Sequence, residues 1–91
     1  MPSHWSVTKV MRAVDDTRVR VGSSVVRIHA DTTLCAGEGR SRRRGGVRQW
    51  RHFRCTHTTR RGLGRDVDFR VHVLGARRFV ITDARWVADV P

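Results

Sequence analysis

The chain has 91 residues, and we expect it to form a single domain over residues 1–91, because this length cannot support a second useful core. Hydrophobic residues make up 38% of the chain, which suffices for a modest core and argues against wholesale disorder. No apolar run approaches the roughly 18 residues of a membrane span. No apolar stretch of signal-peptide length opens the chain. We therefore expect neither an integral membrane protein nor an export precursor.

Positive charge is concentrated in the middle third of the sequence. Lys and Arg number 19 against 8 Asp and Glu, which gives a net charge of +11. No acidic residue lies between Glu38 and Asp66, an interval that holds ten arginines. Such a segment attracts polyanions, among them nucleic acid, phosphorylated cell-wall polymers and acidic lipid headgroups. The alternative is a compositional bias of a GC-rich genome, since Lys9 is the one lysine.

A single helix is expected near the N-terminus. Ser3 is placed to cap a helix over about residues 4–15, and two aspartates, Asp15 and Asp16, are expected to mark its end. The apolar stripe of this helix consists of Val7, Val10, Met11 and Val14.

The remaining residues, about 17–87, are expected to form antiparallel strands. A short hairpin is predicted around Gly22–Ser23, with residues 17–21 and 25–28 as its strands. Longer strands are predicted over residues 34–43, 47–58, 66–74 and 77–87. The expected fold is therefore α+β, with one N-terminal helix packed on a twisted antiparallel sheet of four or more strands.

Glycines divide the arginine-rich segment. Gly37 and Gly39 predict a bulge or a close backbone approach within residues 34–43. Gly45–Gly46 predicts the tip of a hairpin.

The two cysteines are equidistant in sequence from Gly45. A hairpin with its tip there brings Cys35 and Cys55 nearly opposite each other on neighbouring strands, at a separation that a disulfide can span. Such a bridge closes a loop of about 20 residues and stabilises the fold by about 3 kcal/mol in the chain-entropy model. An even cysteine count in this arrangement favours an oxidising compartment.

Two other chemistries are open to the cysteines. His52, Cys55 and His57, with Cys35 as a fourth ligand, would form a zinc site, but on a strand His52 points away from the other two. A catalytic Cys–His pair lacks a recognisable third group or helix N-terminus. We therefore expect no metal, no cofactor and no enzymatic activity.

Aromatic residues alternate with arginines in residues 50–54. Such a strand can stack nucleic-acid bases while its arginines hold phosphates. Trp50 and Phe53, however, are three residues apart and are expected to point to opposite faces. We therefore expect these rings to serve the core or a sheet edge.

Two spaced motifs carry a resemblance to a known group of proteins. They are Cys35-x-Gly37-x-Gly39 and Trp50-x-His52-Phe53-x-Cys55. The pattern resembles that of small exported actinobacterial proteins, most of them uncharacterised, which implies a mature exported domain whose signal peptide is not in this chain. The order of helix and strands is also similar to cystatin-like folds, by analogy of fold alone, and no cystatin inhibitory hairpin is visible.

The leading expectation is a non-enzymatic, exported binding module. Its partner is expected to be an anionic surface (a cell-wall polymer, an anionic lipid or nucleic acid) or a protein. The alternative is an intracellular nucleic-acid-binding protein that contacts phosphates through the same arginines, and the oligomeric state stays open. The expected anion-binding residues are Arg40, Arg42, Arg43, Arg44, Arg60, Arg61 and Arg65.

Overall fold

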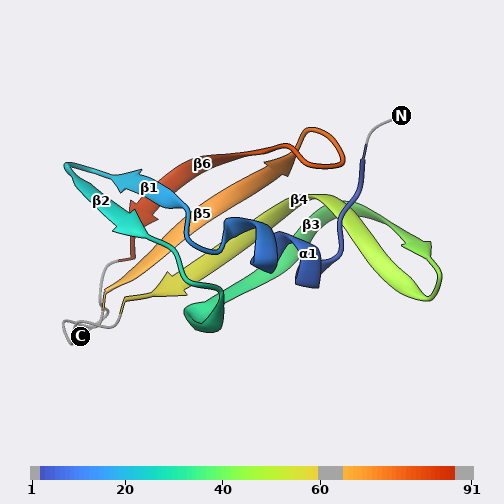
Figure 1. Cartoon of the computed structure of the whole chain (residues 1–91), viewed down its shortest axis with the longest axis horizontal. Helices are drawn as coiled ribbons and strands as arrows, with labels where there is room; N and C mark the ends of the chain where they lie inside the picture. The colour runs from blue at the N-terminus through green and yellow to red at the C-terminus, as the bar shows by residue number, and fades with distance from the viewer. Residues whose placement is uncertain (1–2, 60–64, 88–91) are drawn as a thin grey trace.

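One helix and two antiparallel sheets make up the computed structural model of the chain, which describes residues 3–59 and 65–87 (Figure 1). The elements are α1 (Val7–Val14), β1 (Arg18–Val21), β2 (Ser24–Arg27), the 3₁₀ turn η1 (Ala30–Thr32), β3 (Thr33–Arg44), β4 (Val47–Thr58), β5 (Asp66–Val73) and β6 (Phe79–Trp86). β1 and β2 form a hairpin, whereas β3, β4, β5 and β6 pair in sequence order. The predicted α+β fold, with a helix on a four-stranded antiparallel sheet, is confirmed. Within residues 3–59 and 65–87, no helix is long and apolar enough to cross a membrane.

The helix begins at Val7, and the predicted start near residue 4 is wrong. Its cap is Ser6 instead of Ser3, since the Ser6 hydroxyl accepts a hydrogen bond from the Lys9 amide at 3.2 Å. The cause is a backbone pairing between Trp5 and Trp50, in which each amide donates to the other's carbonyl at 2.8 Å. This pairing holds Trp5 in an extended conformation, so the helix cannot include it.

The hydrophobic core lies between the four-stranded sheet and a layer made of α1 and the β1–β2 hairpin (Figure 1). Successive side chains of a strand point to opposite faces, so every second residue of β5 is buried, as predicted. The buried sheet residues are Phe53, Cys55, Val67, Phe69, Val71 and Val73. The covering layer contributes Val10, Val14, Val19, Val21 and Ile28. The opposite face of the sheet is mostly polar, which leaves it open to solvent.

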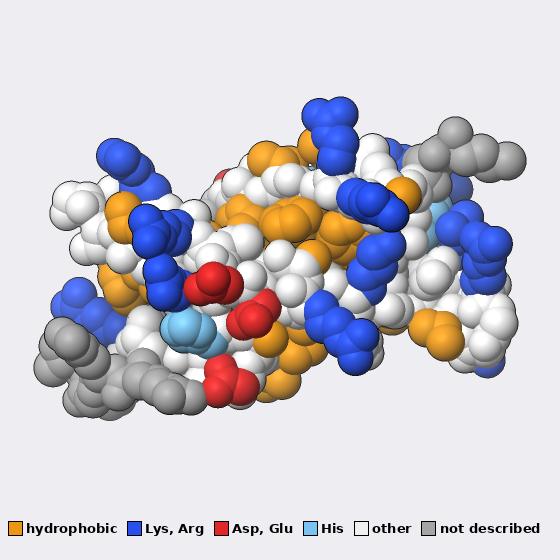
Figure 2. All heavy atoms as spheres, viewed as in Figure 1, with side chains coloured by type: hydrophobic (Ala, Val, Ile, Leu, Met, Phe, Trp, Pro, Cys, Tyr) orange, Lys and Arg blue, Asp and Glu red, His pale blue; other side chains and the backbone are white. Residues whose placement is uncertain are grey.

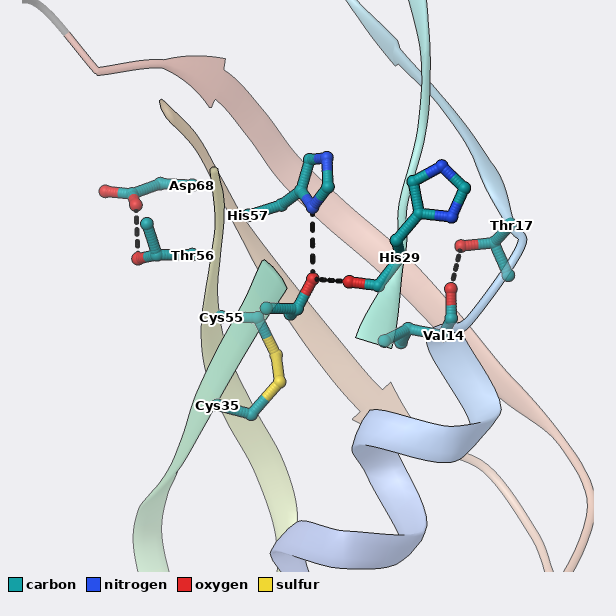
Figure 3. Close-up of a disulfide and its surroundings, with 9 residues drawn as sticks. Val14, Thr17, His29, Cys35, Cys55, Thr56, His57 and Asp68 are labelled. Atoms are coloured by element: carbon teal, nitrogen blue, oxygen red, sulfur yellow. Dashed lines mark hydrogen bonds between the residues drawn. A yellow bond between two sulfur atoms is a disulfide. The ribbon is translucent and has the colours of Figure 1, made fainter. Parts of the chain in front are cut away.

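The β3–β4 hairpin has the turn and the disulfide that the cysteine spacing predicts. Gly45 and Gly46 have φ values of 57° and 79°, which suits the two-residue turns that connect twisted strands. Cys35 stands directly opposite Cys55, and the two are joined by a disulfide on the core side of the sheet (Figure 3). Because the disulfide holds Cys35 opposite Cys55, it fixes the register of β3 against β4 at this position.

Replacing both cysteines by alanine should lower the free energy of unfolding by about 3 kcal/mol, because the unfolded chain regains the freedom of a loop of about 20 residues. Denaturant unfolding of the oxidised protein and of Cys35→Ala/Cys55→Ala measures this difference. A loss below about 1 kcal/mol would show that the pairing of β3 and β4 alone already holds the register.

Both glycines of β3 take the roles predicted for them. A bulge places Gly39 and Arg40 opposite a single residue of β4, and Gly39 has a φ of 77°. Gly37 leaves room for the ring of Trp50, since a side chain at this position would overlap that ring.

The prediction that Trp50 and Phe53 point to opposite faces is wrong. Their rings meet edge to face with centroids 6.0 Å apart, and Trp50 packs against the core beside Gly37. Simple alternation fails here because the bulge in β3 bends and twists the strand pair. Trp50 is therefore a packing residue at the base of the distal hairpin and is not an open stacking platform.

Gly37→Ala should destabilise the protein by about 1–3 kcal/mol, because the added methyl group overpacks the contact with Trp50. A double-mutant cycle with Trp50→Ala measures the coupling by denaturant unfolding. The cost of the alanine should nearly vanish once the ring is absent. An equal cost in both backgrounds would mean that the backbone, and not the ring, requires the glycine.

Candidate anion-binding arm

The distal half of the β3–β4 hairpin, residues 40–51, extends beyond the rest of the sheet, and we call it the arm (Figure 1). Pairing between β4 and β5 ends at His52 and His72, so beyond that point β5 no longer supports β4. Beyond that point Trp5 pairs with β4 in place of β5, through its two backbone hydrogen bonds to Trp50. The base of the arm is thus held on the β4 edge by Trp5 and on the core side by the packing of Trp50.

The arm carries six exposed arginines and no acidic residue. They are Arg40, Arg42, Arg43, Arg44, Arg48 and Arg51. Arg43 and Arg48 stand directly opposite each other in the ladder, a like-charge arrangement that is destabilising. Across residues 3–59 and 65–87, none of the six takes part in an ion pair. The arm therefore accumulates positive charge that the described chain leaves uncompensated.

Two neutral side chains orient arginines on the arm. Arg48 Nη1 donates to Ser41 Oγ at 2.7 Å, and Arg42 Nε donates to Gln49 Oε1 at 3.3 Å. Because strand residues alternate between faces, Arg43 and Arg48 share one face while Arg42 lies on the other. Both faces of the arm thus present guanidinium groups, which bind phosphates and carboxylates through paired N–H donors.

The structure brings part of the predicted anion-binding set together. Arg40, Arg42, Arg43 and Arg44 all lie on the arm, whereas Arg60 and Arg61 lie outside the described residues. Arg65 precedes β5 and lies at the opposite end of the sheet from the arm, where its carbonyl accepts a hydrogen bond from Thr59 Oγ1 at 2.7 Å. Arg65 and the arm therefore do not form one site.

The residue-level prediction left out Arg48 and Arg51, although both lie in the same acid-free interval. Their place on the arm follows from the return strand of the hairpin, which the Gly45–Gly46 turn already indicates. The register of β3 against β4 could have identified these residues, since it places Arg48 opposite Arg43.

Acidic side chains are unevenly distributed over the surface. In Figure 2, blue side chains occur at both ends of this face; at the right end, over the arm, no red side chain accompanies them, whereas the visible red side chains lie in the left half beside blue ones. A cationic end of this kind focuses the field toward polyanions and raises their rate of encounter.

The zinc and cysteine-catalysis alternatives are wrong, because the sulfurs of Cys35 and Cys55 are bonded to each other and offer no thiolate. His52 and His57 also lie on opposite faces of β4: His57 is buried, whereas His52 is exposed and its Nδ1 lies 2.8 Å from His72 Nδ1. In the described ranges, no three His, Asp, Glu or Cys side chains are grouped to hold a metal ion.

His57 is a buried titratable group beside the disulfide, with 3% of its surface exposed. Its Nδ1 lies 3.2 Å from the hydroxyl oxygens of both Thr32 and Thr33. Thr33 donates its own hydroxyl proton to the His29 carbonyl at 2.6 Å, so its oxygen can accept from His57 Nδ1–H (Figure 3). Burial lowers the pKa of His57 below its ordinary value of 6.5, and repulsion from His29 lowers it further.

The free energy of unfolding should therefore fall as the pH drops below 6.5. In this range His57 binds a proton in the unfolded chain, whereas the buried ring of the folded protein stays neutral to lower pH. Above pH 6.5 the contribution of the neutral His57 ring to the free energy of unfolding is fully present. His57→Asn keeps an N–H donor and removes the titration, so its stability should fall less steeply on acidification. Urea unfolding of both proteins from about pH 8 to pH 5 tests this, and identical slopes would assign the pH dependence to other groups.

Comparison of the chain with protein-family models, with curated proteins and with solved structures finds no match.

Proposed function

We propose that the protein is a non-enzymatic, exported binding module whose arm contacts a phosphate-bearing polyanionic surface, such as a cell-wall polymer or a layer of anionic lipid headgroups. The observation that carries this proposal is the directly opposed pair of Arg43 and Arg48 on an arm without acidic residues. Like charges so placed oppose folding, and an anion bound between them reverses the sign of the interaction.

The arm is suited to binding because its base is ordered before any partner arrives. Three features order it: the backbone pairing of Trp5, the packing of the Trp50 ring and the Cys35–Cys55 bridge. They lie within the proximal hairpin or at the arm's base. A preorganised binding element loses less conformational entropy on association than a disordered basic tail does. The distal ladder therefore presents its arginines at fixed spacings, set by the strand repeat.

The disulfide supports export. Intramolecular disulfides form and persist in oxidising compartments and are rare in the cytosol. Cys55 is fully buried, which protects its sulfur from attack by dissolved thiols. The resemblance to small exported actinobacterial proteins points in the same direction, and both favour this function over an intracellular nucleic-acid-binding role.

Removing the opposed pair should weaken polyanion binding and its salt dependence together. We expect Arg43→Gln/Arg48→Gln to bind phosphatidylglycerol vesicles and a glycerol-phosphate polymer at least tenfold more weakly at low salt, because two phosphate contacts are lost. With duplex DNA as a calibrating polyanion, the slope of log K against log salt should become less negative by about 2, near 0.9 for each lost contact.

The matched control is Arg77→Gln/Arg78→Gln, which removes the same charge from exposed positions in the turn between β5 and β6. It should retain most of the affinity. If the two double variants lose affinity equally, net charge and not the arm governs binding. A clear preference for DNA over both surface polyanions at 0.15 M salt would favour the nucleic-acid alternative.

A further inference from the structure

The open face of the four-stranded sheet has a depression of about 320 Å³ beside a distortion in β6. Two residues of β6, Asp83 and Ala84, stand opposite the single residue Phe69 of β5. Asp83 has a φ of 56°, in the left-handed region that few non-glycine residues adopt. Bulges of this kind redirect side chains and occur often beside binding sites. The depression is thus associated with a local departure from regular sheet geometry.

Three arginines from three different strands line this depression: Arg54, Arg70 and Arg85. Arg54 and Arg70 stand directly opposite each other, so their charges repel across β4 and β5. Arg70 Nε lies 3.7 Å from Glu38 Oε1, near the limit of an ion pair. The guanidinium groups of Arg54 and Arg85 make no hydrogen bond or ion pair with the part of the chain that the structure describes. Their guanidinium donors are available to a ligand.

Two carboxylates line the same depression and are held by threonine hydroxyls. Thr56 Oγ1 donates to Asp68 Oδ1 at 2.7 Å (Figure 3), and Thr82 Oγ1 donates to Asp83 Oδ2 at 3.3 Å. The Thr82 oxygen in turn lies 2.7 Å from His72 Nε2, so the Asp83 side chain ends a short hydrogen-bonded chain. Each carboxylate has a second oxygen that can accept a hydrogen bond from a ligand.

We propose that this depression binds a hydroxylated anion, namely a sugar that carries a carboxylate or a phosphate group. Guanidinium groups bind either acidic group through paired N–H donors, whereas Asp68 and Asp83 can accept only from donors such as hydroxyls. Three arginines and two aspartates leave one net positive charge in the lining, which favours a ligand that is anionic overall over a zwitterion. The depression lies near the small end of small-molecule sites, about 300–1,000 Å³, and this size suits a single sugar unit.

This site is separate from the arm. Its lining residues come from β4, β5 and β6 within the part of the sheet where all three strands pair, and none belongs to residues 40–51. The proposed ligand site therefore depends on its own lining residues and does not rest on the proposed function of the arm.

Amide chemical-shift mapping with simple probes tests the site. Glucuronate and glucose 6-phosphate distinguish the carboxylate from the phosphate source, and at least one of them should shift the amides of residues 68–70 and 83–85. We expect that probe to bind at least tenfold more tightly than acetate, inorganic phosphate or neutral glucose, because only a hydroxylated anion satisfies both the arginines and the aspartates.

Three variants separate this site from general charge effects. Arg85→Gln should weaken binding of the preferred probe at least fivefold, whereas Arg77→Gln, with the same charge change at an exposed turn, should not. Asp83→Asn tolerates the same backbone conformation and should reduce the preference for the sugar anion over the bare anion. The proposal is overturned if the probes shift only arm residues, if bare anions bind as tightly, or if Arg77→Gln has the same effect as Arg85→Gln.

Discussion

The pairing of β3 with β4 is the constraint on which the rest of the molecule depends. The disulfide fixes this register at Cys35 and Cys55, on the core side of the sheet and below the bulge at Gly39. Everything distal to the bulge then has a fixed place, including the opposition of Arg43 and Arg48. A slip of one residue would turn the strand faces over and scatter the arginines. The covalent bond therefore determines how charge is displayed as well as how much stability the small core has.

The fold was predictable wherever its signals are local. The strict alternation of residues 66–74 identifies a half-buried strand, because the side-chain period of a strand is two. Gly45–Gly46 identifies a tight turn, since both positions require positive φ values, and the turn in turn sets Cys35 opposite Cys55. Each of these inferences uses residues close together in sequence or symmetric about one turn.

The parts that sequence reasoning missed depend on contacts between distant segments. Trp5 pairs with Trp50 through backbone atoms alone, and such pairing leaves no residue pattern; it also displaced the start of the helix. The rings of Trp50 and Phe53 meet because a bulge on the neighbouring strand changes the local twist. The cluster of arginines on the open face requires the registers of three strands and the irregularity at Asp83, none of which the sequence signals.

The arm is an ordered cationic ladder although β5 does not extend along it. Native-state amide exchange of the oxidised protein tests it most directly. We expect the hydrogen-bonded amides within residues 41–49 to exchange well below random-coil rates, even in the absence of any polyanion. Random-coil exchange throughout these residues, with β4–β6 amides of residues 53–57 and 67–73 still protected, would contradict it. The arginines would then form a flexible basic loop with no fixed geometry.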